Sequence, residues 1–199
     1  MAKGFAPAAE RNRQPILDVL RRVLPETGLV LEVASGTGQH AVFFSERMSD
    51  LRWQPSDASV EALRSINAWV EESNRENLLP PIELDACSHP WPIASADALL
   101  CINMIHISPW EATESLFQGA RALLAGGSPL VTYGPYKQHG EHSAPSNAAF
   151  DASLRSRNSR WGVRDLDELI ELAGRTGFAL QERCSMPANN MTLVWSRVT

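Results

Sequence analysis

A glycine-containing loop near the start of the chain has residue types and spacing that suit a nucleotide-like ligand. The loop runs from Glu32 to Gly38 (EVASGTG), directly after the apolar run that begins at Leu29, and a helical pattern follows it. Glycine lets the backbone approach a ligand closely, and the free amide groups and dipole of the following helix would point at that ligand. The run from Gly36 to Ala41 also matches the relaxed dinucleotide pattern G-x-G-x-x-A, which by itself does not identify the ligand.

Two carboxylates near this loop narrow the kind of ligand that it suits. Glu32 ends the expected first strand, where a negative charge repels a pyrophosphate but suits a ligand that carries ammonium and sulfonium centres. Asp57 follows about 20 residues after the loop, where a carboxylate can accept hydrogen bonds from both ribose hydroxyls. Capping of the next helix is the alternative role for Asp57. Glu32 has no comparable structural role, so it favours a cationic ligand.

The apolar residues around these groups alternate between helical and strand spacing, which predicts an α/β fold. Residues 98–102 are continuously apolar, as expected for a central strand that helices bury on both faces. Ser108 with Glu111 and Asp165 with Glu168 are spaced as helix-capping pairs. We expect strands at 29–34, 51–55, 82–85, 98–102 and 130–133, and helices at 16–24, 41–48, 60–70, between 108 and 126, and at 165–173.

The end of the chain is expected to form two further strands, at 178–184 and 191–196. Their short connection requires an antiparallel pair, because parallel neighbours need a long crossover. Asn189 and Asn190 are interpreted as turn residues, since asparagine tolerates left-handed backbone.

The domain organisation is predicted to be a single domain over residues 1–199, with a leading helix region at 1–27. The polar stretch 134–164 is too long for a simple connector. We interpret it as a substrate-side insertion.

Polar residues that follow the fourth and fifth strands are candidates for contact with a reacting molecule. In an open α/β sheet, ligands bind beyond the carboxyl ends of the strands, which points to Asn103, His106, Tyr133 and Tyr136. His106 is the best general-base candidate, because the usual histidine pKa lies near 6.5. A histidine that only packs and hydrogen-bonds is an equally open interpretation. Asn103 either positions an amine or carboxylate or satisfies backbone groups at the strand end.

Seven segments spread over nearly the full length carry a family resemblance: AERNR (9–13), LEVASGTGQH (31–40), QPSD (54–57), NMIHISPW (103–110), YGP (133–135), WGVRD (161–165) and MPANN (186–190). Through them the chain resembles the class I methyltransferases, and within these the uncharacterised methyltransferase-like 26 family. The resemblance implies a Rossmann-like, seven-stranded, mostly parallel sheet with helices on both faces and an antiparallel C-terminal hairpin. It also implies S-adenosylmethionine as cofactor, bound over strands one to four.

The same resemblance implies which residues hold the cofactor. Asp57 would bind the ribose, and Asp85 with Ala86 the adenine edge. Ala34 stands where most methyltransferases have glycine, so the backbone there is expected to approach the cofactor less closely. The expected cofactor-binding set is Glu32, Ala34, Ser35, Gly36, Gly38, His40, Asp57, Asp85, Ala86 and Asn103, and the expected catalytic set is His106, Asn103 and Tyr133.

Methyl transfer to an unidentified acceptor is the expected activity, and a small molecule is the expected acceptor. An oxidoreductase that uses NAD(P) is one alternative, because the glycine pattern alone also suits that cofactor, although no second nucleotide-binding half is evident. A non-catalytic protein that only binds S-adenosylmethionine is the other alternative. The sequence does not predict the oligomeric state.

Composition and charge exclude several other classes of function. A formal net charge of −5 does not favour a nucleic-acid partner, and the basic groups at 11–13 and 155–164 are interpreted as solvated faces. Three cysteines without a CxxC pair, and His139 with His142 alone in a polar loop, predict neither disulfides nor a metal site. We expect a cytoplasmic protein without a membrane partner, since no apolar run reaches the length of a signal peptide or a bilayer span.

Overall fold

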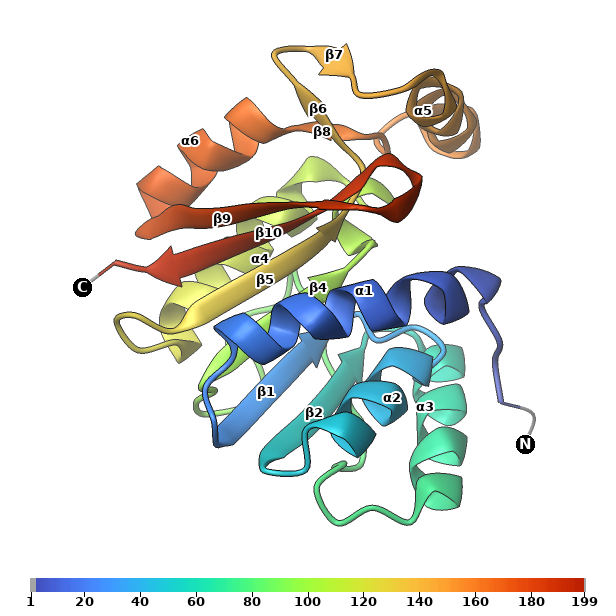
Figure 1. Cartoon of the computed structure of the whole chain (residues 1–199), viewed down its shortest axis with the longest axis vertical. Helices are drawn as coiled ribbons and strands as arrows, with labels where there is room; N and C mark the ends of the chain where they lie inside the picture. Colours follow the sequence, from blue (N-terminus) through green and yellow to red (C-terminus); the bar gives the residue numbers. More distant parts are fainter. Residues whose placement is uncertain (1–2, 199) are drawn as a thin grey trace.

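A central seven-stranded sheet organises the computed structural model, which describes residues 3–198 (Figure 1). The strand order is β3-β2-β1-β4-β5-β10-β9, and neighbours from β3 to β5 are parallel. β10 runs antiparallel to both β5 and β9. The strands are β1 (Gly28–Val33), β2 (Leu51–Asp57), β3 (Ile82–Glu83), β4 (Ala98–Ile102), β5 (Pro129–Gly134), β9 (Phe178–Met186) and β10 (Asn190–Arg197). The predicted fold class and C-terminal hairpin are therefore confirmed.

Helices cover both faces of this sheet, and Figure 1 shows α1 (Pro7–Val23) in front of it and α4 (Trp110–Leu123) behind it. On one face, α1 and α2 pack Leu17 and Phe44 against Val30 of β1. On the other face, α4 and α6 pack Phe117 and Leu169 against the strands. This double cover explains why all five residues of β4 are buried. The α-helices are α1 (Pro7–Val23), α2 (Gln39–Arg47), α3 (Val60–Ser73), α4 (Trp110–Leu123), α5 (Pro145–Arg157) and α6 (Leu166–Thr176).

A small three-stranded sheet and α5 (Pro145–Arg157) occupy the polar stretch 134–164, which the sequence predicts to be a substrate-side insertion. The chain leaves β5 and forms β6 (Tyr136–Gln138), β7 (Glu141–His142), α5 and then β8 (Arg164–Asp165), in the order β7-β6-β8. We call residues 134–165 the cap. The buried carboxylate of Asp151 holds it together. Asp151 accepts from the Val163 amide at 2.8 Å and lies 3.1 to 3.3 Å from charged or titratable nitrogens of three side chains, those of Arg155, Lys137 and His142.

The first helix begins earlier than expected. The sequence suggested a start after Pro15, whereas α1 begins at Pro7 and continues through Pro15. An internal proline removes one hydrogen bond and costs about 3 kcal/mol. Burial of Ala9 and Asn12 on the same helix as Ile16 offsets that cost, because these residues pack as one face.

One of the two predicted helix caps is confirmed and the other is wrong. Asp165 caps α6, and its side chain accepts from the Asp167 amide. Ser108 does not cap α4, because its hydroxyl donates instead to the Met104 carbonyl at 2.8 Å and the N-cap residue is Pro109. Within residues 3–198, no helix combines the length and apolarity needed to cross a bilayer.

Candidate active site

The glycine loop joins the carboxyl end of β1 to α2 through several left-handed residues. Gly36 and Gly38 have φ angles of 58° and 89°, and Ala34 has a φ of 58°. Left-handed backbone costs an alanine about 1 kcal/mol or more, so this conformation favours glycine at position 34. A Cβ added to Gly38 would lie 2.9 Å from the Ile66 Cα, whereas one added to Gly36 would meet nothing within 4 Å. Gly38 is thus required for close packing against Ile66, whereas the backbone at Gly36 is accessible to a ligand.

Ser35 fixes the loop to the neighbouring strand β2. Its amide donates to the Ser56 carbonyl at 2.8 Å, and its hydroxyl accepts from the Ser56 amide at 3.1 Å. The same hydroxyl donates to the Glu32 carbonyl at 3.1 Å. Ser35 is buried, so its side chain positions the loop from within.

Asp57 lies at the end of β2 and contacts the loop directly. Its carboxylate accepts from the Gly36 amide at 2.9 Å and from the Ser59 amide at 2.9 Å. The N-cap of α3 is Ser59, whose hydroxyl accepts from the Ala62 amide. The capping alternative for Asp57 is therefore wrong, and its carboxylate stands at the loop.

Glu32 has a structural partner that the sequence did not reveal. Its side chain is only 1% exposed and accepts a hydrogen bond from the Trp53 indole at 2.6 Å. The pKa of Glu32 is raised to about 7, chiefly because the side chain is buried and in smaller part because the charge of Asp57 is near, while the Trp53 hydrogen bond opposes the shift. The carboxyl group therefore changes its charge close to neutral pH.

The end of β3 completes this edge of the sheet. The Leu84 amide donates to the Asp57 carbonyl at 3.0 Å, which brings Asp85 beside the end of β2. Asp85 is exposed, and its carboxylate accepts from the Cys87 amide and the Ser88 hydroxyl at 2.9 and 3.1 Å. Ala86 is buried. We call residues 34–38 with 57, 85 and 86 the loop edge.

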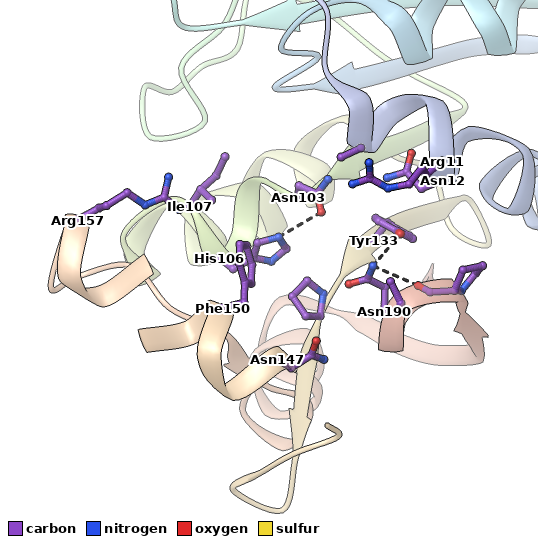
Figure 2. Close-up of a pocket in the computed structure, with 14 residues that line it drawn as sticks. Arg11, Asn12, Asn103, His106, Ile107, Tyr133, Asn147, Phe150, Arg157 and Asn190 are labelled. Atoms are coloured by element: carbon purple, nitrogen blue, oxygen red, sulfur yellow. Dashed lines mark hydrogen bonds between the residues drawn. The ribbon is translucent and has the colours of Figure 1, made fainter. Parts of the chain in front are cut away.

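A pocket of about 480 Å³ opens beyond β4 and β5 (Figure 2). Five segments form it: α1, the turn after β4, the end of β5, α5 and the hairpin between β9 and β10. Asn103, His106 and Tyr133 all line it, so the structure brings the three predicted catalytic residues together. The other lining residues are Ala8, Arg11, Asn12, Ile107, Pro135, Asn147, Phe150, Arg157, Pro187, Ala188 and Asn190.

His106 holds the side chain of Asn103. The imidazole Nε2 lies 3.2 Å from Asn103 Oδ1, and since an amide oxygen only accepts, Nε2 carries the proton. The ring is 1% exposed and packs against Gly134, where an added Cβ would collide with it. The pKa of His106 is lowered to about 3, chiefly because the ring is buried and in smaller part because of the charge of Arg164. His106 is therefore neutral, and Nδ1 has no hydrogen-bond partner among the described residues.

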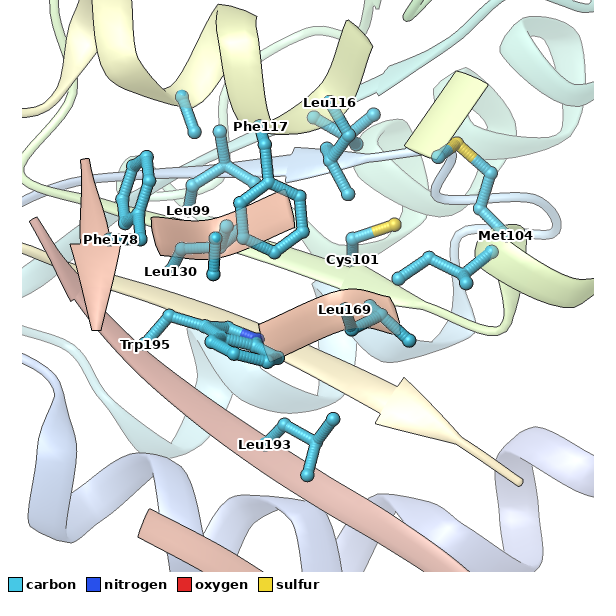
Figure 3. Packing of buried hydrophobic residues seen from close by; sticks show 14 of the residues in the cluster. Leu99, Cys101, Met104, Leu116, Phe117, Leu130, Leu169, Phe178, Leu193 and Trp195 are labelled. Atoms are coloured by element: carbon cyan, nitrogen blue, oxygen red, sulfur yellow. The ribbon is translucent and has the colours of Figure 1, made fainter. Parts of the chain in front are cut away.

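The turn that presents Asn103 and His106 is anchored in the core. Asn103 has a φ of 65°, and its amide donates to the Tyr133 carbonyl at 2.9 Å. The next residue, Met104, inserts into the core cluster that contains Leu116 and Cys101 (Figure 3). The short 3-10 turn Met104–His106 thus places Met104 and Ile105 in the core, while Asn103 and His106 on either side of them line the pocket.

Tyr133 belongs to a buried polar chain that spans several elements. Its hydroxyl accepts from the side-chain Nδ2 of Asn190 at 3.0 Å. Burial raises the pKa of Tyr133, and hydrogen bonds with Asn12 and Asn190 oppose this shift. Asn12 in turn bonds His40 Nε2 at 2.8 Å, and burial lowers the pKa of His40 to about 4. His40 therefore lies between α1 and α2 with its ring bonded to Asn12.

Some residues are placed differently from the expectations. Tyr136 is fully buried in the core beside α6 and does not line the pocket, because the chain passes Pro135 and turns inward. Asn189 has the expected left-handed backbone (φ 56°), but Asn190 begins β10 in extended conformation. The pocket residues on α5, Phe150 among them, were missed, and the length of the polar stretch was the only signal for them.

Comparison with known proteins gives a family and a fold. The model of a family described as "Protein of unknown function (DUF938)" matches residues 3–197. Among solved structures, an O-methyltransferase family 2 protein from Planctomyces limnophilus in complex with apigenin has a TM-score of 0.81 and 19% identity, over 96% of this chain and 58% of that chain. An O-methyltransferase family protein from Burkholderia thailandensis has a TM-score of 0.79 and 15% identity, over 94% and 56%.

A third similar structure is a methyltransferase of calicheamicin biosynthesis in its SAH-bound form, with a TM-score of 0.75 and 16% identity, over 94% of this chain and 54% of that chain. The chain thus spans little more than half the length of these proteins. At such identities the likeness establishes a shared fold.

Proposed function

The chain belongs to the DUF938 family, and we propose that it transfers a methyl group from S-adenosylmethionine to a small-molecule acceptor in the pocket beside Asn103. The family has no known function, so the support comes from this chain's own residues and from its fold. The resemblance to the methyltransferase-like 26 family carries the same expectation for cofactor and activity.

The adjacency of the loop edge and the pocket is the observation that carries the proposal. β1 and β4 are parallel neighbours with Val33 opposite Cys101, so the glycine loop and Asn103 leave the sheet side by side. Asn103 belongs both to the expected cofactor set and to the pocket lining. A transferase needs this arrangement, because donor and acceptor must meet in line.

The residues of the loop edge fit the proposed cofactor. Gly36 offers an open backbone with left-handed φ, and Asp57 and Asp85 present carboxylates for hydroxyl and amino groups of a nucleoside. Glu32 lies behind the loop with a pKa near 7, so a cationic ligand would favour its charged form. S-adenosylmethionine, when bound, supplies an activated methyl group on a sulfonium centre.

Neutral hydrogen-bonding groups would orient the acceptor. His106 donates to Oδ1 of Asn103. The Nδ2 hydrogens of Asn103 can therefore donate to an oxygen of the methyl-accepting molecule. Asn190 donates to the Tyr133 hydroxyl, whose own proton remains available because burial raises its pKa. We assign Asn103 and Tyr133 to acceptor binding and His106 to the orientation of Asn103. A general-base role for His106 would require its buried Nδ1 to become accessible.

Calorimetry with S-adenosylmethionine, S-adenosylhomocysteine and NADH tests the cofactor. We expect the first two to bind and NADH not to bind. Binding of NADH alone at millimolar concentration would instead support the oxidoreductase alternative. A labelled-methyl assay over fractionated metabolite pools then tests transfer, and cofactor binding without any labelled product would contradict the enzymatic part and leave a binding protein.

A further inference from the structure

The pocket lining is positively charged, in a protein whose net charge is negative. Two arginines line it, Arg11 from α1 and Arg157 from α5, and no aspartate or glutamate does. The protein as a whole carries a formal charge of −5. The buried His106 stays neutral and does not change this balance. A pocket with this lining attracts anions and disfavours cations.

Arg157 differs from Arg155 and Arg160 of its own segment because it has no hydrogen-bonded or ion-paired carboxylate among the described residues. Its Nε donates to the Ser153 carbonyl at 3.4 Å, and the guanidinium lies over the Trp161 ring at 5.7 Å. No carboxylate in residues 3–198 lies within 4.0 Å of it. Its neighbours are held by oxygens of the chain: Arg155 by Asp151, Arg160 by Glu111, and Arg164 by the carbonyls of Ile105, Ser108 and Arg160.

Exposed apolar side chains lie in the same pocket. Phe150 is 37% exposed and Ile107 is 44% exposed, and both line the cavity. Phe150 stands edge-on to the His106 ring, with centroids 6.1 Å apart. Figure 2 shows the Arg157 side chain extending toward Ile107. An apolar ligand body would cover these side chains and gain roughly 25 cal/mol for each Å² of apolar surface removed from water.

We propose that the acceptor is a small aromatic carboxylic acid, whose ring lies against Phe150 and Ile107 and whose carboxylate is bound by Arg157, an assignment that rests on the proposed methyl transfer. A guanidinium donates two parallel hydrogen bonds to a carboxylate, which fixes orientation as well as charge. Asn103 and Tyr133 then remain to bind the group that receives the methyl.

Binding of three matched probes tests this assignment: 4-hydroxybenzoate, 4-hydroxybenzamide and 4-hydroxybenzylamine, titrated into the full chain and followed by NMR. They share one ring and differ in charge. We expect the acid to bind about tenfold more tightly than the amide, as a charge-assisted pair at a partly exposed site allows, and the amine to bind most weakly. In Arg157→Gln the affinity for the acid should fall to the affinity for the amide.

Arg160→Gln is the matched control, because Arg160 lies on the same segment but is paired with Glu111 outside the pocket lining. It should keep the preference for the acid. Phe150→Ala should weaken all three probes alike. Equal binding of acid and amide to the wild type, or a preference that survives in Arg157→Gln, would overturn the assignment. The titrations need no cofactor, so a failure of S-adenosylmethionine to bind would count against the proposed function separately.

Discussion

The loop edge and the acceptor pocket lie side by side on one sheet but are built in different ways. The loop edge is a backbone structure, in which left-handed residues and main-chain hydrogen bonds of Ser35 and Gly36 set the shape. The pocket is a side-chain structure, assembled from five segments that tertiary packing brings together. We therefore expect changes to the loop backbone to abolish cofactor binding, and changes to the pocket side chains to alter acceptor binding alone.

The strongest test of this difference is a branched side chain at Gly36. Gly36→Val should lower the affinity for S-adenosylhomocysteine by roughly a hundredfold or more, because the side chain fills the approach to the loop backbone. Calorimetry measures the loss. The acid probe of the acceptor pocket should still bind.

Gly127→Val separates occlusion from strain. Gly127 is also exposed, has a φ of 85° and has open space around an added Cβ, but it lies in the turn before β5, away from the loop. Both variants should lose stability similarly, by about 1–2 kcal/mol for left-handed backbone. Equal cofactor affinity in the two variants would contradict the role of Gly36.

The same difference decides how much of the site the sequence could predict. Ser35, Gly36 and Asp57 were found because a strand, a glycine turn and the next strand end are local signals. Asn190 was misread as a turn residue because its partner Tyr133 is 57 residues away, and only the pairing of β5 with β10 brings them together. No local pattern encodes such a contact.

The cap is a second region that the sequence predicts only in part. Strands from 98–102 and 130–133 were predicted because burial imposes an apolar pattern on them. α5 was missed because two of its three buried residues, Asn147 and Asp151, are polar, so apolar periodicity does not mark it. A helix that is held in place by a buried carboxylate depends on tertiary hydrogen bonds and ion pairs, which a local sequence pattern does not indicate.

Asp151→Asn should loosen the cap without affecting the loop edge. The carboxylate is buried among Lys137, His142 and Arg155, and removal of one partner from a buried ion cluster costs on the order of 3 kcal/mol. Chemical denaturation and hydrogen exchange over 134–165 measure the change. Binding of the acid probe should weaken, whereas S-adenosylhomocysteine binding should persist.

Glu171→Gln is the control for that variant, because the exposed Glu171 lies 3.9 Å from Arg175 and is a surface pair. Such pairs contribute about 0–1 kcal/mol. A loss of cofactor affinity in Asp151→Asn that equals its loss of probe affinity would show that the two regions are not independent.

Glu32→Gln should change how stability depends on pH. The folded pKa of Glu32 is raised to about 7, so the protein holds a proton that the unfolded chain, with its ordinary pKa near 4.5, has released. The contribution of the protonated Glu32 carboxyl to the free energy of unfolding is complete below pH 4.5 and is lost as the pH rises through 7. The variant should therefore gain stability relative to the wild type between pH 5 and 8, by on the order of 2 kcal/mol.

The comparison with the wild type at each pH is essential for Glu32. Buried His106 and His40 have lowered pKa values, so they contribute an opposite dependence, in which stability is lost as pH falls below their unfolded pKa. Both histidines are also present in Glu32→Gln, so their effect cancels when the stability of the wild type is subtracted from that of the variant at each pH. A stability difference that stays constant with pH would show that the Glu32 carboxyl is not forced toward its neutral form.

Two alanines with the same strained backbone give the finest test of the difference between the regions. Ala34 in the loop edge and Ala188 in the pocket hairpin both have a φ of 58°. Ala188→Gly should raise stability by up to about 1 kcal/mol, since relief of left-handed strain exceeds the entropy cost of glycine at an exposed site. Ala34→Gly should raise it less, because the Ala34 methyl packs against the core.

The two variants should also differ in their affinity for the cofactor. Ala34→Gly should improve S-adenosylhomocysteine affinity by about twofold to threefold, because the loop backbone can approach the ligand more closely. Ala188→Gly should leave it unchanged. If Ala188→Gly alters cofactor affinity as much as Ala34→Gly does, the hairpin and the loop edge are coupled, and the buried chain from His40 through Asn12 and Tyr133 to Asn190 is the connection that would transmit the effect.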